Sequence, residues 1–170
     1  MATRDGLLGL GSNVGDRRAQ LQAAVDALPA VGELLACSST YDTDPVGELL
    51  EQPSFLNACV LLRTSLEPLE LLAEVKRLEL ELGRVDQGIR HGPRAIDIDI
   101  LLLGDLQLAE QRMRLPHEQL LSRRFVLIPA LELDFDLRAP SGERLSDALA
   151  TLALDEGVRW AGPPLRLPQG

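Results

Sequence analysis

The alternation of apolar and polar residues predicts two kinds of secondary-structure element in the first hundred positions. Short apolar runs, bounded by glycine, proline or polar clusters, predict β-strands. Two longer segments, residues 16–28 and 65–82, repeat apolar residues every three or four positions and predict helices that bury one face. The predicted strands span residues 6–10, 31–41, 55–64 and 95–103. The predicted buried faces are Leu21, Ala24, Val25 and Leu28 in the first helix, and Leu71, Leu72, Val75, Leu78 and Leu82 in the second.

Both predicted helices have recognisable ends. Asp16 is suited to cap the first helix, and Pro29 ends it. Ser65 is suited to cap the second, Pro68 is tolerable in its first turn, and Gly83 ends it.

The resulting β-α-β-β-α-β order predicts an α+β fold, a ferredoxin-like antiparallel sheet with helices packed on one face. In that topology the fourth strand lies beside the first and runs antiparallel to it. The start of the fourth strand therefore lies close to the turn Gly11-Ser12-Asn13. The other face of the sheet is expected to stay open.

Beyond residue 104 the pattern is weaker. It predicts a small hairpin starting near residues 106–108, an apolar run over 126–131 and a helix over 145–154. We expect residues 1–160 to form one domain and residues 161–170 to form a flexible tail.

The fourth strand carries the most distinctive pattern in the chain. Side chains two apart share a face of a strand, so Ile96, Ile98 and Ile100 point one way while Asp97 and Asp99 point the other. A solvated edge strand would explain such a pair. Paired carboxylates directly after Gly92-Pro93-Arg94 also suit a Mg²⁺-bound polyphosphate, because Mg²⁺ prefers oxygen ligands.

Composition limits the classes of function. A net charge of −9 argues against general nucleic-acid binding, and no apolar run approaches the ~20 residues that span a bilayer. The N-terminal residues lack the pattern of a signal peptide, and Cys37 and Cys59 have no paired spacing. We therefore expect a cytoplasmic protein with two reduced, buried thiols and no membrane partner.

Several other motifs are weaker. Residues 9–15 resemble a dinucleotide fingerprint, but the third glycine is one position late and no repeated βαβ pattern follows. His91 and His117 lack metal-ligand spacing, which favours ordinary hydrogen bonding. Phe55 and Phe125 are either core residues or stacking partners for a flat heterocycle.

Six motifs in order make the chain similar to a known family. They are Gly11-Ser12-Asn13, Pro53-x-Phe55-Leu56-Asn57, Glu79-x-x-x-Gly83-Arg84, Gly92-Pro93-Arg94-x-x-Asp97-x-Asp99, Pro116-His117 and Arg124-Phe125-Val126-Leu127-x-Pro129. Over residues 6–155 the chain resembles the 6-hydroxymethyl-7,8-dihydropterin pyrophosphokinases of folate biosynthesis. The resemblance implies transfer of pyrophosphate from ATP to the hydroxymethyl oxygen of a reduced pterin, with release of AMP.

The resemblance also implies roles for individual residues. Asp97 and Asp99 would bind two Mg²⁺ ions, and Arg84 and Arg94 would complete the catalytic site from a mobile loop. The implied pterin pocket is Thr43, Val46, Phe55, Asn57 and Phe125. The implied ATP side is Glu79, Arg84, Arg94, Ile100, Arg112, Arg114, His117 and Arg123.

The chain departs from the usual family pattern at three positions: His91 stands where tryptophan is frequent, Glu118 where an aromatic residue or proline is frequent, and Asp44 where proline is frequent. Two other functions stay open. One is a non-catalytic homologue that binds pterin or nucleotide, and the other is a D-x-D glycosyltransferase, for which the chain is short. We expect the protein to act as a monomer.

Overall fold

The computed structural model describes residues 2–43, 54–83, 95–152 and 157–168. The chain follows the order β1–α1–β2–β3–β4–α2–β5, and then adds two short strands, two helices and a last strand. In those ranges, no helix combines the length and the apolar character that crossing a membrane requires.

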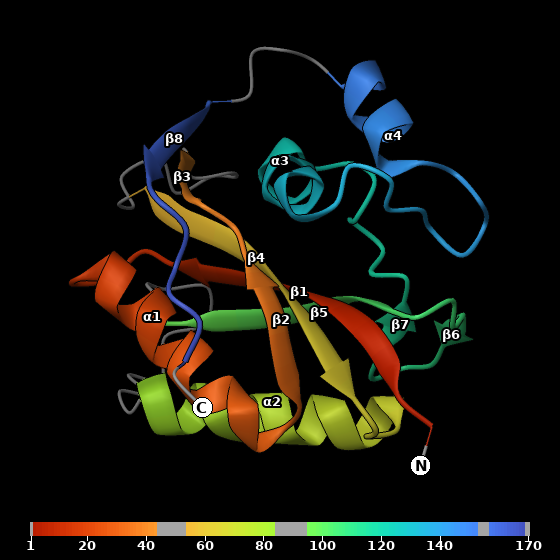
Figure 1. The fold of residues 1–170 in the computed structure, drawn as a ribbon, viewed down its shortest axis with the longest axis horizontal. Coiled ribbons are helices and arrows are strands. Elements are labelled where there is room, and N and C mark those ends of the chain that lie inside the picture. Colours follow the sequence, from red (N-terminus) through yellow and green to blue (C-terminus); the bar gives the residue numbers. More distant parts are fainter. Residues whose placement is uncertain (1, 44–53, 84–94, 153–156, 169–170) are drawn as a thin grey trace.

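A six-stranded antiparallel sheet forms the middle layer of the molecule (Figure 1). Its main path is β5–β1–β4–β3–β8, and β2 pairs with β4 off this path. Because β5 lies beside β1 and runs antiparallel to it, the predicted ferredoxin-like α+β fold is confirmed. The strands are β1 (Arg4–Ser12), β2 (Glu33–Cys37), β3 (Thr40–Thr43), β4 (Phe55–Thr64), β5 (Asp97–Leu103) and β8 (Val158–Gly162).

Helices α1 (Arg17–Ala27) and α2 (Pro68–Gly83) cover one face of the sheet, drawn below it in Figure 1. Their predicted apolar faces pack in one core with Ile98 and Ile100 of β5, which confirms the helical periodicity, although Leu72 and Leu82 are only partly buried. Asp16 caps α1 as expected, since its side chain accepts a hydrogen bond from the backbone N–H of Ala19.

The start of α2 differs from the prediction that Ser65 caps it. The carbonyl of Glu67 accepts the first helical hydrogen bond, from Leu71 at 2.9 Å, and the N–H of Glu67 donates to the carboxylate of Glu70 at 3.2 Å. Pro68 then occupies the first helical position, where its missing N–H leaves no bond unmade. The helix therefore begins after Glu67, and the carboxylate of Glu70 accepts from the N–H of Glu67 where a serine cap was expected.

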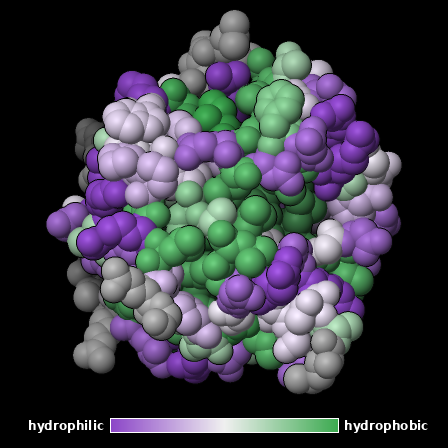
Figure 2. Space-filling view, viewed as in Figure 1, coloured by the Kyte–Doolittle hydropathy of each residue, from purple (hydrophilic) through white to green (hydrophobic). Residues whose placement is uncertain are grey.

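Helices α3 (Arg124–Leu133) and α4 (Leu145–Thr151) lie over part of the opposite face. The sequence predicted that this face stays open, and only the half that carries Asp97 and Asp99 does. A register shift opposite β1 brings both Leu101 and Leu102 into a second apolar core with α3 and α4. Figure 2 shows apolar surface gathered in the middle of the view, between the region of these helices and that of α1 and α2.

The predicted strand over residues 31–41 is divided into β2 and β3. The break falls at Ser38 and Ser39, whose side chains take over hydrogen bonds that a continuous strand would make through its backbone. The Oγ of Ser38 accepts from the N–H of Cys59 at 2.9 Å and donates to the carbonyl of Ser39 at 2.7 Å. The apolar pattern does not reveal this break because the spacing of apolar residues carries no information on the hydrogen bonds of serine hydroxyls.

The end of the chain also differs from the expected flexible tail. Residues up to 162 belong to β8, which pairs with β3, and the side chain of Leu165 is only 3% exposed. The Arg18 guanidinium donates to the carbonyls of Pro163, at 2.9 Å, and Pro164, at 3.3 Å. One buried leucine and donors from α1 therefore hold a segment whose composition alone suggested fraying. The predicted small hairpin is present as β6 (Leu108–Ala109) and β7 (Arg114–Leu115).

Candidate functional site

The strand register brings the two aspartates against the glycines of β1. Gly11 lies opposite Asp97, and Gly9 lies opposite Asp99. Asp97 is half-buried and Asp99 is exposed. The predicted proximity of the aspartates to the first turn is therefore confirmed, and β1 presents no side chain between β4 and β5 at these two positions.

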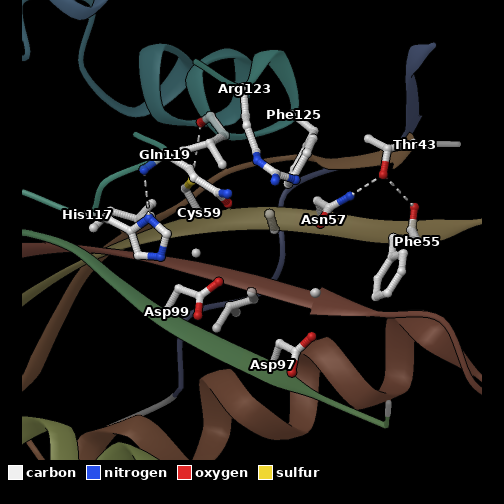
Figure 3. A pocket seen from close by; sticks show the side chains of 16 residues that line it. Thr43, Phe55, Asn57, Cys59, Asp97, Asp99, His117, Gln119, Arg123 and Phe125 are labelled. Atoms are coloured by element: carbon white, nitrogen blue, oxygen red, sulfur yellow. Dashed lines mark hydrogen bonds between the residues drawn. The ribbon is translucent and has the colours of Figure 1, made fainter. Parts of the chain in front are cut away.

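A cavity of about 230 Å³ opens above this bare stretch of β1 (Figure 3). Its walls come from β3, β4, β5, the segment before α3 and α3 itself, so residues far apart in the sequence meet in one place. The lining residues are Gly9, Leu10, Gly11, Thr43, Phe55, Asn57, Ala58, Cys59, Asp97, Asp99, Leu101, His117, Gln119, Arg123, Phe125 and Val126.

A hydrogen bond orients the amide of Asn57 inside this cavity. Its Nδ2 donates to the Oγ1 of Thr43 at 2.6 Å, and that hydroxyl lies 3.5 Å from the carbonyl of Phe55, to which it donates. Thr43 and Asn57 are 5% and 8% exposed. The three residues predicted on β3 and β4 for the pterin pocket are therefore brought together, with a fixed polar edge.

An ion-paired cluster supports the same ends of β3 and β4. The guanidinium of Arg17 donates to the carboxylate of Asp42 at 2.6 Å, and to the carbonyl and hydroxyl of Ser54 at 2.9 and 3.0 Å. The hydrogen bond from Arg17 is the main reason that the pKa of Asp42 lies below its usual value, although partial burial acts in the opposite direction. Because Asp42 and Ser54 precede Thr43 and Phe55 in the chain, this cluster fixes the backbone next to both.

Helix α3 supplies the opposite wall. Phe125, in its first turn, and Arg123, directly before it, both point toward β4 (Figure 3). The Arg123 guanidinium carbon lies 5.4 Å from the centre of the Phe125 ring, a cation–π distance. Arg123 was expected on the ATP side, and that role stays a prediction; in the structure its side chain lines this first cavity, because it is the residue directly before α3.

A second cavity of about 270 Å³ lies on the other side of Asp99. Four of the residues predicted for the ATP side line it: Ile100, Arg112, Arg114 and His117. The predicted Glu79 stands next to this cavity, where its carboxylate accepts from the N–H of Ile98 at 2.7 Å. Lys76 also lines the cavity and was not predicted, although it pairs with Glu79 across one helical turn, at 3.0 Å.

Asp99 and His117 line both cavities. The Nδ1 of His117 accepts a hydrogen bond from the backbone N–H of Gln119 at 3.1 Å, so in the neutral ring the proton lies on Nε2. A ligand in each cavity would therefore approach the other at Asp99, with an imidazole donor beside it.

The two aspartates suit a magnesium ion better than a metal held by protein alone. Among the described residues, no group of three or more histidine, cysteine or acidic side chains could hold a metal. Mg²⁺ is commonly bound through one or two carboxylates, and substrate phosphates and water complete its octahedral shell. Asp97 and Asp99, on one strand face and in one cavity, fit that donor set.

Two further lining residues, Cys59 and Gln119, were not singled out for the site by the sequence. Cys59 is 1% exposed, and burial followed by the charge of Glu132 raises the pKa of its thiol. It is therefore an unreactive wall of the cavity. The prediction of two buried thiols holds for Cys59, whereas Cys37 is only half-buried, and both are free.

The residues named in the sequence analysis that lie outside the described residues are Asp44, Val46, Pro53, Arg84, His91, Gly92, Pro93 and Arg94. Their roles stay predictions.

The sequence and the fold both resemble known proteins. The sequence model of the family described as 7,8-dihydro-6-hydroxymethylpterin-pyrophosphokinase (HPPK) matches residues 7–135. The 2-amino-4-hydroxy-6-hydroxymethyldihydropteridine pyrophosphokinase of Pseudomonas aeruginosa is 44% identical over 155 residues, which cover 90% of this chain and 94% of that protein. The protein of the same name from Methylorubrum extorquens is 44% identical over 147 residues, covering 85% of this chain and 91% of that protein.

A solved structure supports the fold independently. The crystal structure of wild-type Plasmodium falciparum HPPK-DHPS with pteroate matches with a TM-score of 0.70 at 13% identity, covering 88% of this chain and 44% of that chain. At this identity the likeness concerns the fold alone. With the family match and the relatives at 44% identity, it leads to one conclusion: the chain belongs to the 7,8-dihydro-6-hydroxymethylpterin-pyrophosphokinase family, and is a diphosphotransferase.

Proposed function

We propose that the chain transfers pyrophosphate from ATP to the hydroxymethyl group of 6-hydroxymethyl-7,8-dihydropterin, with Mg²⁺ bound at Asp97 and Asp99. The observation that carries this proposal is the arrangement of two cavities that share Asp99 and His117. One cavity suits a flat heterocycle and the other suits a polyphosphate. Their common wall is where the two substrates would react.

The first cavity has the features that bind a pterin. The Asn57 amide can both donate to and accept from the polar edge of the ring, and Thr43 holds that amide in place. Phe55 and Phe125 enter the cavity from different elements and would stack on the two ring faces. Val46 would complete this pocket. The hydroxymethyl group would then reach toward the aspartates across Gly11.

The second cavity has the features that bind a nucleoside triphosphate. Arg112, Arg114 and Lys76 supply positive charge in a protein that is acidic overall, and Ile98 and Ile100 supply apolar contacts. Glu79 fixes the β5 backbone there, through its hydrogen bond with Ile98. We expect ATP to extend its phosphates toward Asp99 and His117, so that the bridging and transferred groups lie next to the first cavity.

In the reaction, the hydroxymethyl oxygen forms a bond to the β-phosphorus, the bond from that phosphorus to the α,β-bridging oxygen breaks, and AMP leaves as the hydroxyl proton is released. The chain's main contribution is alignment and charge neutralisation. Two bound Mg²⁺ ions would neutralise the charge of the phosphate oxygens and make the hydroxyl group of the pterin more acidic. Arg84 and Arg94 are proposed to stabilise the transferred group, together with His117, which lines both cavities, and Arg123, which lines the first.

The products of turnover test this proposal. Purified protein is incubated with ATP, Mg²⁺ and 6-hydroxymethyl-7,8-dihydropterin, and the nucleotides are separated by chromatography. We expect AMP and a pterin diphosphate in equal amounts, and no AMP when either the pterin or Mg²⁺ is left out. ADP as the product would contradict the proposal. Binding of both substrates without turnover would instead support a non-catalytic homologue, and membership of the family leaves no support for a glycosyltransferase.

We further propose that the enzyme acts as a monomer in the cytoplasm. Its two cysteines are free, which suits a reducing compartment. Light scattering after size-exclusion chromatography is expected to give a mass near 18.5 kDa, and a dimer mass would contradict the monomer.

A further inference from the structure

Glu132, near the end of α3, connects that helix to the sheet through hydrogen bonds. Its carboxylate accepts from the backbone N–H of Ser39 at 2.8 Å, from the hydroxyl of Ser39 at 3.0 Å and from the hydroxyl of Tyr41 at 2.6 Å. Ser39 lies at the break between β2 and β3, where the regular ladder to β4 is interrupted, and Tyr41 lies in β3 two residues further along the chain. The carboxylate of Glu132 on α3 thus accepts from the backbone N–H of Ser39, in place of a carbonyl of a neighbouring strand.

The hydrogen bonds of Glu132 connect the same helix and the same sheet face that enclose the proposed pterin cavity. Glu132 follows Phe125 by seven positions, so the two lie on nearly the same face of α3, ~10 Å apart along its axis. Tyr41 and Thr43 are two apart on β3 and therefore share a face of the sheet. Tyr41 lies opposite Asn57 in the register with β4. One face of α3 and one face of the sheet therefore lie opposite each other at two places. At one place Glu132 connects them by hydrogen bonds, and at the other the cavity separates them.

We propose that Glu132 is a positioning residue that sets the separation between Phe125 on α3 and the Thr43–Asn57 edge on the sheet. We call this separation the ring slot. The proposal rests on the proposed function, because the ring slot matters only if a flat heterocycle enters it. Figure 3 shows the two walls of the ring slot. Phe125 and Arg123, at the start of α3, form one wall, and Asn57 and Thr43, on the sheet, form the other.

The apolar packing of α3 is independent of Glu132. Leu127, Ala130 and Leu131 bury the helix against β4 and α4, and Leu127 and Ala130 are fully buried. Glu132 itself is exposed, so its loss removes an attachment without opening a hole in the core. We therefore expect α3 to stay on the sheet without Glu132, with a less defined position of its first turn.

Tyr41 of β3 is the sheet's side-chain partner of Glu132 in this connection between sheet and helix. Partial burial, then the hydrogen bond to Glu132, raise the pKa of Tyr41 far above its usual value. Tyr41 therefore stays a donor over the whole range in which the enzyme can be assayed. Tyr41→Phe removes one hydrogen bond of the three and keeps the aromatic ring.

The test compares Glu132→Ala, Glu132→Gln and Tyr41→Phe in the full chain, by titration calorimetry with the pterin, titration with a non-hydrolysable ATP analogue, and steady-state AMP formation. We expect Glu132→Ala to raise the Kd for the pterin about tenfold, and Tyr41→Phe about threefold, as losses of one to three surface hydrogen bonds allow. Glu132→Gln keeps the length and one acceptor, and should recover part of the loss. The Kd for the nucleotide analogue should not change.

Val25→Ala is the matched control, because Val25 is fully buried in α1 and touches neither cavity. It should lower the melting temperature at least as much as Glu132→Ala and leave the pterin Kd unchanged. The proposal is overturned if Glu132→Ala lowers only the melting temperature, or if pterin and nucleotide affinities fall together. Should Glu132→Ala not fold, an unchanged pterin Kd in Tyr41→Phe overturns it equally. Failure of the wild-type chain to bind the pterin would contradict the proposed function instead.

Discussion

Gly11 offers a sharp test of how the pterin cavity is built. It lies between Asn57 on β4 and Asp97 on β5, on the strand face that forms the cavity floor. A methyl group at this position would lie 3.1 Å from the Oδ1 of Asn57 and 3.8 Å from the ring of Phe55. Asn57 would have to move by a few tenths of an ångström, and the floor on which the ring is proposed to lie would be raised.

The expected size of the effect follows from those contacts. A shift of Asn57 weakens its 2.6 Å bond to Thr43 and misaligns the amide with the pterin edge. One such hydrogen bond contributes ~0.5–1.5 kcal/mol, so Gly11→Ala should raise the pterin Kd about 3- to 10-fold. Replacing a glycine with alanine also restricts the unfolded chain, which stabilises by ~0.4–1 kcal/mol and offsets the crowding. The melting temperature should therefore change little.

The assay is titration calorimetry of Gly11→Ala with the pterin and, separately, with a non-hydrolysable ATP analogue. Gly9→Ala provides a graded comparison, because the nearest atoms to its added methyl belong to the side chain of Leu101, at 3.3 Å, and not to Asn57 or Phe55. We expect the pterin Kd to rise more in Gly11→Ala than in Gly9→Ala, with nucleotide binding unchanged in both. Wild-type pterin affinity in Gly11→Ala would refute the placement of the ring over β1.

Two other changes test neighbouring parts of the site. Arg17→Ala should lower stability by ~1–2 kcal/mol at neutral pH, a fall of roughly 2–8 °C in Tm, because it removes the donor that Asp42 and Ser54 share. The pKa of Asp42 is lower in the folded protein than in the unfolded chain. The stabilisation from the Arg17–Asp42 pair is therefore complete above the unfolded-state pKa of ~3.9, and it disappears as pH falls through the folded-state pKa. The difference in melting temperature between the two proteins should therefore shrink as pH falls below ~3.9, leaving only the part that comes from Ser54, and a difference that stays constant down to the acid limit of folding would contradict the assignment. Phe125→Ala should weaken pterin binding by ~0.5–1.5 kcal/mol or more through lost stacking, measured by calorimetry, and an unchanged Kd would place the ring elsewhere.

The order of elements was predictable because apolar spacing reports directly on burial. The face made by Ile96, Ile98 and Ile100 is buried as predicted. The break at Ser38 and Ser39 was not predictable from that spacing, since it depends on hydroxyl groups and on Glu132, which is distant in sequence. The packed C-terminal segment was missed for a related reason, because its partners lie on α1 and β3.

The site shows the same division between local and long-range information. The juxtaposition of Asp97 with Gly11 followed from topology alone, once β5 was placed beside β1. The position of Arg123 in the first cavity did not, because it depends on where α3 begins and how that helix lies over β4. Lys76 was also missed. A lysine and a glutamate three apart on a helix usually indicate a solvated face, and here that face borders the second cavity.

The central claim is that Asp97 and Asp99 bind Mg²⁺ at the junction of the two substrates. The most direct measurement is the rate of AMP formation by Asp97→Asn and Asp99→Asn at saturating substrates and increasing Mg²⁺, with circular dichroism to confirm folding. Asp105→Asn is the matched control, since Asp105 is exposed just beyond the end of β5 and lines neither cavity. We predict that each site variant is folded and loses about 100-fold or more in kcat, while the control keeps wild-type activity. Near-wild-type turnover in both site variants would contradict the account.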